Sequence, residues 1–256
     1  MFTIRSTLVI GAAVALLGAG MVPAQAATYH AADLTAVGGT SYFDINMTPV
    51  QVDFGPGRGL GSLSVASLNG GNWQNIVSNP NIRNPGTYTL GTGDSLVAAQ
   101  TIIFAPNNPS RDNTPRGFSL TFNLAPGHVF DAGSLFIAFS LDRFGSQSST
   151  FFQPGLAFGA PDTASLPSDG SAPLVQVGSD ANGPIYGAAS GISEGRAFAL
   201  LDSVESFTVN FTATGGPQGV AFYFAQVPVS VPEPTTMALT AAGLVGLGLM
   251  RRRRPA

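Results

Sequence analysis

One serine stands in a pattern that is associated with nucleophilic catalysis. Residues 191–195 read Gly-Ile-Ser-Glu-Gly and match the G-x-S-x-G nucleophile elbow, with Ser193 at its centre. In α/β-hydrolases the histidine follows the serine along the chain, whereas His30 and His128, the two histidines here, both precede it. His128 could serve a triad of another order, but a lone histidine in a turn sequence is typical of a surface. We therefore interpret the motif as a glycine-rich turn and expect no catalytic residue in it.

Loop carboxylates could hold calcium, because hard cations prefer oxygen ligands. Asp162, Asp169, Asp180 and Asn182 lie in one loop-rich region, without the spacing of an EF-hand. The same Asp-Ala-Asn-Gly stretch that begins at Asp180 is also a favourable turn sequence. A structural calcium site is thus a secondary hypothesis, and we expect no other cofactor. The two histidines form no local ligand pair, which argues against zinc.

Two further kinds of chemistry would act on polysaccharides. A glycosidase needs two carboxyl groups that face each other across a cleft, and the 11 aspartates could supply them, although spacing along the chain does not reveal such a pair. Trp73, the one tryptophan, lies among asparagines and glutamine, where an exposed indole could stack on a sugar ring. Tyr29, Tyr42 and Tyr88 could assist it. Our first interpretation of Trp73 is a partly buried core residue, and sugar stacking is the alternative.

Composition excludes several classes of function. The chain has no lysine and no cysteine, so lysine nucleophiles, phosphate-binding lysines, disulfides and thiol catalysis are all absent from it. Residues 27–230 contain six arginines against eleven aspartates and two glutamates, a net charge of about −7. Such an acidic region repels phosphate backbones, and we therefore expect no nucleic-acid partner.

The elements that must position these residues are predicted to be short β-strands. The 32 glycines and 19 prolines interrupt helices and supply turns, while 18 phenylalanines supply bulky core side chains. Apolar and polar residues alternate strictly over residues 118–124 and 135–141, and again over 207–211 and 220–224. We predict that each of these two pairs forms an antiparallel hairpin.

Weaker signals complete an all-β prediction. Further strands are expected at residues 42–47, 50–54, 63–68, 87–90, 101–104, 174–177 and 196–201. The predicted fold is an antiparallel β-sandwich or jelly roll that spans residues 27–227 as one domain. The main local alternative is a short helix over residues 194–204.

The N-terminal 26 residues have the organisation of a secretory signal peptide. Arg5 is followed by an apolar run over residues 8–17 and by small residues that end in Ala24-Gln25-Ala26. This order of charge, apolar stretch and A-x-A sequence predicts cleavage between Ala26 and Ala27, with the Sec translocon and signal peptidase as partners.

The C-terminal region reads as a stalk, a membrane helix and a charged tail. Residues 228–234 are rich in proline and should be extended. Residues 235–250 are uncharged and would form a helix of about 24 Å, which is close to the thickness of a bilayer core. The tail, residues 251–256, contains Arg251, Arg252, Arg253 and Arg254, and the positive-inside rule assigns it to the cytoplasm.

The motif before this membrane segment carries a family resemblance. Val231, Pro232, Glu233 and Pro234, followed at once by a short apolar span and an arginine cluster, resemble the PEP-CTERM sorting signal of Gram-negative bacteria. In that family an exosortase recognises the tail in the membrane and is thought to process the protein near the motif. The resemblance covers about 25 residues and implies an exosortase partner, a destination in the cell envelope or outside the cell, and an association with exopolysaccharide and biofilm.

The resulting hypothesis is an exported, non-catalytic protein of structural or adhesive function. A transient anchor in the inner membrane and a final position at the cell surface or in the extracellular matrix follow from the two terminal signals. A carbohydrate-binding module that uses Trp73 is the first alternative, and a secreted hydrolase with paired aspartates is the second.

Overall fold

The structure is a computed structural model of the chain, and it describes most of the predicted domain. The described residues are 26–32, 43–44, 49–54, 60–68, 72–75, 86–98, 102–107, 115–139, 141–143, 148–163, 166, 170–215 and 220–228. The predicted membrane helix, the arginine tail and the sorting motif lie outside these residues, as does the predicted signal peptide apart from its last residue, Ala26.

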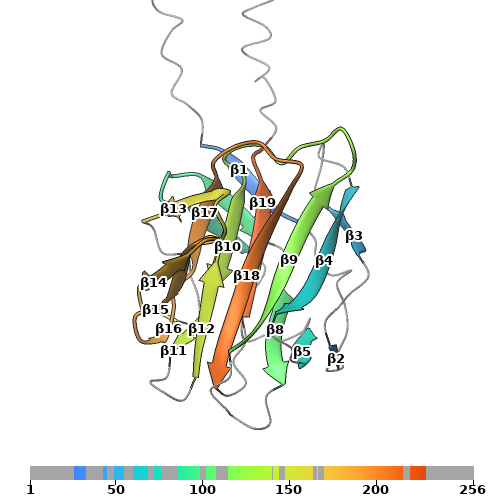
Figure 1. Cartoon of the computed structure of the whole chain (residues 1–256). Coiled ribbons are helices and arrows are strands. Elements are labelled where there is room, and N and C mark those ends of the chain that lie inside the picture. Colours follow the sequence, from blue (N-terminus) through green and yellow to red (C-terminus); the bar gives the residue numbers. More distant parts are fainter. Residues whose placement is uncertain are drawn as a thin grey trace, which may run out of the picture.

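The described residues form two β-sheets and no helix (Figure 1). Sheet A has ten strands: β1 (Thr28–Ala31), β2 (Phe43–Asp44), β5 (Asn72–Asn75), β6 (Gly86–Thr89), β7 (Ser95–Ala98), β8 (Ile102–Asn107), β10 (Leu135–Phe139), β13 (Phe158–Pro161), β17 (Arg196–Leu200) and β19 (Val220–Gln226). Sheet B has nine strands: β3 (Val50–Asp53), β4 (Leu60–Leu68), β9 (Arg116–Leu124), β11 (Asp142–Arg143), β12 (Ser148–Gln153), β14 (Leu174–Asp180), β15 (Gly183–Ala188), β16 (Gly191–Ile192) and β18 (Ser206–Gly215).

Most strands in both sheets pair in an antiparallel manner. The main path of sheet A runs β13-β17-β10-β19-β1-β7-β6, and that of sheet B runs β14-β15-β12-β18-β9-β4-β3. The pair β1–β7 is the exception, because these two strands run parallel. The prediction of an all-β region is therefore confirmed, and two sheets with a shared core are typical of a β-sandwich.

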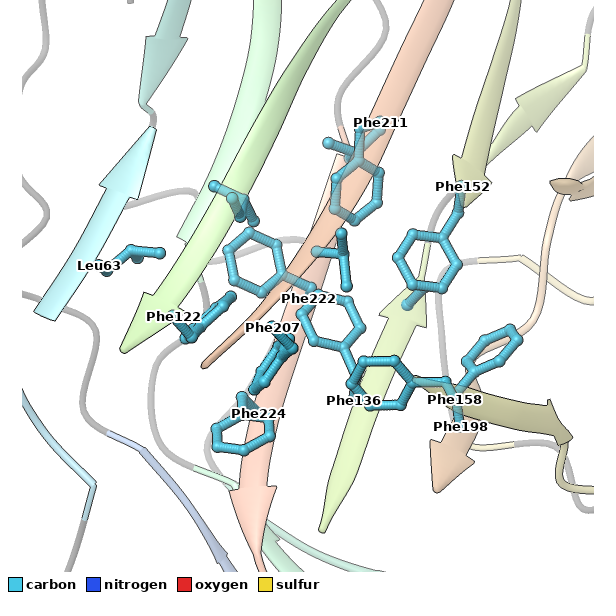
Figure 2. Close-up of a cluster of buried hydrophobic side chains, with 14 of the residues drawn as sticks. Leu63, Phe122, Phe136, Phe152, Phe158, Phe198, Phe207, Phe211, Phe222 and Phe224 are labelled. Carbon is cyan, nitrogen blue, oxygen red and sulfur yellow. The ribbon is translucent and has the colours of Figure 1, made fainter. Parts of the chain in front are cut away.

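Phenylalanine side chains from both sheets form the core between them (Figure 2). Phe136 on β10 of sheet A stacks on Phe152 of sheet B, with ring centroids 5.2 Å apart, and meets Phe122 of sheet B edge-on at 6.1 Å. On its own sheet it stacks on Phe222 of β19 at 5.4 Å. Aromatic pairs in such geometries add to the energy of burial, so the phenylalanines fix how the two sheets face each other.

Both predicted hairpins are wrong in their pairing, although their strands exist. β9 pairs with β4 and β18 of sheet B, whereas β10, the next strand along the chain, pairs with β17 and β19 of sheet A. The strands β18 and β19 are likewise in different sheets. In each case the chain crosses from one sheet to the other. Alternation shows which side chains face the core, but it is the same for a hairpin partner and for a strand on the opposite wall.

Sheet A is covered on its second face as well. All seven residues of β19 are buried, which a strand with one solvated face cannot show. Its even-numbered positions face the core between the sheets, and its odd-numbered positions join a second cluster. The hairpin β6–β7 contributes Leu90, Leu96 and Ala98 to that cluster, and Leu166 joins them. This second core explains why residues 220–225 form a continuous apolar run.

The helix considered over residues 194–204 is not formed, because β17 occupies its centre and pairs with β10 and β13. The weaker strand predictions correspond to β2, β3, β4, β6, β8, β14 and β17, with residues 45–47 and 101 outside the described part. Several strands were not predicted, among them β12 and β15, whose sequences carry serine, glycine and proline in place of alternation.

Candidate functional site

The two ends of the described domain lie side by side. β1, the first strand, runs antiparallel to β19, the last one, and His30 is opposite Gln226. Continued by two residues, this register sets Thr28 opposite Pro228. The chain therefore enters and leaves the domain at one place, which we call the junction: residues 26–28 and 227–228. Both predicted processing sites flank it, one on each side.

The exit side of the junction is held by the start of β10. The backbone N–H of Val227 donates to the hydroxyl of the buried Ser134 at 3.3 Å. Gly133 precedes this serine with a φ of +86°, and a Cβ added there would lie 3.3 Å from a methyl group of Val227. Glycine is favoured at Gly133 because the backbone is left-handed. The last residues before the sorting motif are thus attached to the core strands.

The entry side is held by the turn between β6 and β7. The backbone N–H of Ala27 donates to Oδ1 of Asp94 at 2.7 Å, and the backbone N–H of Ser95 donates to the carbonyl of Ala27 at 2.8 Å. Oδ2 of Asp94 accepts a hydrogen bond from the hydroxyl of Thr92 at 2.7 Å. Asp94 did not attract attention in the sequence, where Gly91-Thr92-Gly93-Asp94 indicates only a turn.

Two tyrosines near the junction pack against the second core. Burial raises the pKa of Tyr29, and the nearby Asp94 carboxylate raises it further, so the Tyr29 hydroxyl stays neutral at physiological pH. Tyr88 packs against the same cluster. These residues therefore do not form an open stacking surface. Tyr42 lies outside the described residues, and Trp73 is placed only through its backbone on β5, opposite Phe43 and Pro106.

A buried amide lies next to the junction. Gln226 is 5% exposed, and neither its Nε2 nor its Oε1 has a hydrogen-bond partner. Alternation along β19 directs it to the same face as Phe222 and Phe224. A buried polar group without a partner costs about 1–3 kcal/mol, which an apolar side chain of similar size would not.

We expect Gln226→Met to stabilise the domain by about 1 kcal/mol, because it removes this unpaired amide while keeping the length of the side chain. Urea unfolding of the exported protein measures the change. Gln176→Met, at an exposed position of β14, is the matched control and should stay within about 0.5 kcal/mol of the unchanged protein. A loss of stability in Gln226→Met would show that the amide is hydrogen-bonded.

Ser193, the centre of the elbow-like motif, is buried. Its hydroxyl accepts a hydrogen bond from the backbone N–H of Leu141 at 3.0 Å, and its own N–H donates to the carbonyl of the same residue at 2.9 Å. His30 and His128 are both exposed, on β1 and in the turn after β9. In the described structure the serine fastens residues 141 and 193 to each other, in keeping with its interpretation as part of a turn.

The residues considered for calcium are used in separate local contacts. Oδ1 of Asp180 accepts from Nε2 of Gln153 at 2.6 Å and from the backbone N–H of Asn182 at 2.7 Å. Oδ2 of Asp162 accepts from the backbone N–H of Gly91 at 3.0 Å. Asp169 lies outside the described residues. Within the described ranges, no group of three or more histidine, aspartate or glutamate side chains is placed to hold a metal ion.

Glu194, one of the two glutamates of the predicted domain, is also held by a partner. Its carboxylate forms an ion pair with Arg196, and both side chains are largely buried. The guanidinium also donates to the carbonyl of Asp162 at 2.8 Å. The pair therefore connects β17 to the segment that follows β13.

Residues 230–254 match the family described as the PEP-CTERM protein-sorting motif. The chain carries a PEP-CTERM sorting signal. This signal implies an exported protein with an exosortase as its processing partner, and a passage through the membrane toward the cell surface. Comparison with curated proteins and with solved structures gives no match for the chain. Among the described residues no helix is long and apolar enough to cross a membrane, and the span expected at residues 235–250 lies outside them.

The PEP-CTERM signal begins two residues after the junction ends at Pro228. The sequence therefore anticipated the motif residues Val231, Pro232, Glu233 and Pro234, but not that the domain brings both ends of the chain to one place. Only the pairing of β1 with β19 reveals this proximity.

Proposed function

We propose that the chain is an exported, non-catalytic surface or matrix protein, anchored briefly in the inner membrane and then processed by an exosortase. Its two-sheet domain would act as a structural or adhesive unit in contact with exopolysaccharide. The PEP-CTERM motif at residues 230–254 is the observation that carries this proposal. The expected membrane helix, cytoplasmic arginines and cleaved leader complete the route.

The geometry of the junction supports this route. From Pro228 to the start of the expected membrane helix at residue 235 there are seven residues, and an extended chain of that length reaches about 25 Å at most. In the anchored form the junction end of the domain would therefore face the membrane. The residues Pro232, Glu233 and Pro234 would lie in the short connection between the domain and the bilayer, where a membrane enzyme can reach them.

Several observations favour a binding or structural role for the domain over catalysis. Ser193 is buried, and Glu194 is paired with Arg196. Phenylalanines fill the space between the sheets, and the second face of sheet A is covered too. Of the aromatic residues considered for sugar stacking, Tyr29 and Tyr88 pack against the second core, so neither alternative function gains support from them.

We expect mass spectrometry of cell and medium fractions to find a mature chain that begins at Ala27 and lacks Arg251 to Arg254. Cleavage by signal peptidase produces the first end, and exosortase processing near the PEP motif removes the other. Deletion of the exosortase gene in the producing organism is the control, and it should leave the arginines in place. Intact arginines on the exported protein of the unchanged strain would contradict the proposal.

A further inference from the structure

β1 is a short strand in an interior position of sheet A. It has four residues, Thr28–Ala31, and lies between β19, to which it is antiparallel, and β7, to which it is parallel. If cleavage occurs after Ala26, the mature chain begins one residue before this strand. A four-residue strand has few ladder hydrogen bonds, and its position therefore depends on what holds its first residue.

The turn between β6 and β7 presents one carboxylate to that residue. Oδ1 of Asp94 lies 2.7 Å from the backbone nitrogen of Ala27. The turn fixes the carboxylate, since Thr92 donates to Oδ2 at 2.7 Å and the N–H of Leu90 donates to the backbone carbonyl of Asp94 at 2.8 Å. Gly93 adopts a φ of +86° between them. In the described part of the chain the donors to this carboxylate, Ala27 N–H and the Thr92 hydroxyl, are both uncharged before cleavage.

We propose that Asp94 is the binding site for the α-ammonium group of the mature chain. Hydrolysis of the Ala26–Ala27 bond adds one water, leaves a carboxylate on Ala26 and frees the nitrogen of Ala27 as an amine. An α-amino group has a pKa of about 7.7–8.0, so at neutral pH the amine takes up a proton and becomes a cation. The neutral hydrogen bond to Asp94 then becomes an ion pair, and charge-assisted hydrogen bonds are about twice as strong as neutral ones.

Cleavage of the leader thus strengthens the attachment of β1 at the moment when the domain is released. Because β1 also pairs with β19, the same contact steadies the strand that leads into the sorting motif. The negative charge of Asp94 is felt on β1, where it contributes to the raised pKa of Tyr29. The inference rests on the cleavage after Ala26 that the proposed function includes, but not on the exosortase step.

The absence of lysine gives a direct measurement. The α-amino group is the one primary amine of the mature chain, so an amine-reactive acylating reagent modifies Ala27 alone. The rate of its reaction with the exported, processed protein, followed against pH, reports the pKa of this group. The other titratable groups near it are His30 and Tyr29 on β1, Tyr88 on β6, and Asp162, whose carboxylate contacts the turn at Gly91. None of these is an amine.

The expected result is an α-amino pKa above the ordinary range, since a neighbouring carboxylate favours the charged form. Each unit of elevation lowers the reactive, unprotonated fraction about tenfold at pH values below both pKa values. Asp94→Asn should return the pKa to the ordinary range and increase the rate at pH 7 by about tenfold. Asp94→Glu keeps the charge and should retain most of the elevation, whereas Asp202→Asn, at an exposed carboxylate, should leave the rate unchanged.

A second measurement separates the ion pair from the neutral hydrogen bond. Ala24→Phe places a bulky residue in the A-x-A sequence and blocks cleavage, so that Ala27 keeps its amide nitrogen. Hydrogen exchange of residues 28–31 should speed up about tenfold on Asp94→Asn in the processed protein, and much less in the uncut one. An ordinary α-amino pKa that Asp94→Asn does not change would overturn the inference. A mature chain that begins elsewhere than Ala27 would also overturn it, and mass spectrometry distinguishes that outcome from a failure of exosortase processing.

Discussion

Phe136→Ala is expected to destabilise the domain by about 4 kcal/mol, within the range of 3–5 kcal/mol measured for truncation of buried aromatic side chains. Phe136 is fully buried and contacts rings on both sheets (Figure 2). Its removal leaves a cavity between the sheets that the stiff backbone of β10 cannot close. With a urea dependence of about 2 kcal/mol per molar, the unfolding midpoint should fall by about 2 M.

The matched control is Leu156→Ala, which removes an apolar side chain that is 72% exposed. It should change the free energy of unfolding by less than about 0.5 kcal/mol. Both variants are compared as exported, processed proteins by urea unfolding. If Phe136→Ala cost as little as Leu156→Ala, the phenylalanines would not form the contact between the sheets. Since a domain of this size has about 5–15 kcal/mol of stability in total, the variant may be recovered in reduced yield, and that reduction is itself in the expected direction.

The contrast between these two residues shows what the sequence can and cannot predict. Alternation correctly identified the core-facing residues of β9, such as Phe118 and Phe122, and those of β18, such as Phe207 and Phe211. It did not show which strands are neighbours. Phe211 of β18 and Phe222 of β19 have ring centroids 5.9 Å apart because they face each other across the core, not along one sheet. Pairing depends on contacts between distant segments, which a local pattern does not contain.

The parts of the fold that escaped prediction have identifiable causes. β15 contains two glycines and a proline, and β12 begins with two serines, so neither shows a periodic apolar face. β1 is too short for a reliable pattern, and its place between β19 and β7 is set by strands almost 70 and 200 residues away along the chain. The candidate site divides in the same way. The sorting motif is local and could be predicted, whereas the meeting of Ala27, Asp94 and Val227 at one end of the domain could not.

Glu233→Ala is expected to abolish processing at the C-terminus while leaving export intact. Glu233 is the charged residue of the PEP motif, and in the short connection to the membrane it is the one carboxylate after Glu205. Loss of one partner from a charge-assisted contact in a binding site costs more than about 1.4 kcal/mol, which corresponds to a rate reduced at least about tenfold. Pulse-labelling followed by membrane fractionation should show the full-length tail, with Arg251 to Arg254, accumulating in the membrane.

Glu205→Ala is the matched control, because it removes an exposed glutamate from the domain and leaves the tail unchanged. It should be processed at the rate of the unchanged protein, and the leader should be cleaved after Ala26 in both variants. Normal release of Glu233→Ala would mean that the exosortase does not read this carboxylate. Slow processing of both variants would instead point to the fold of the domain, and the unfolding midpoint of each protein separates that case from a recognition defect. The two ends of the chain meet at the junction, yet their processing is chemically independent, and this pair of variants tests that independence.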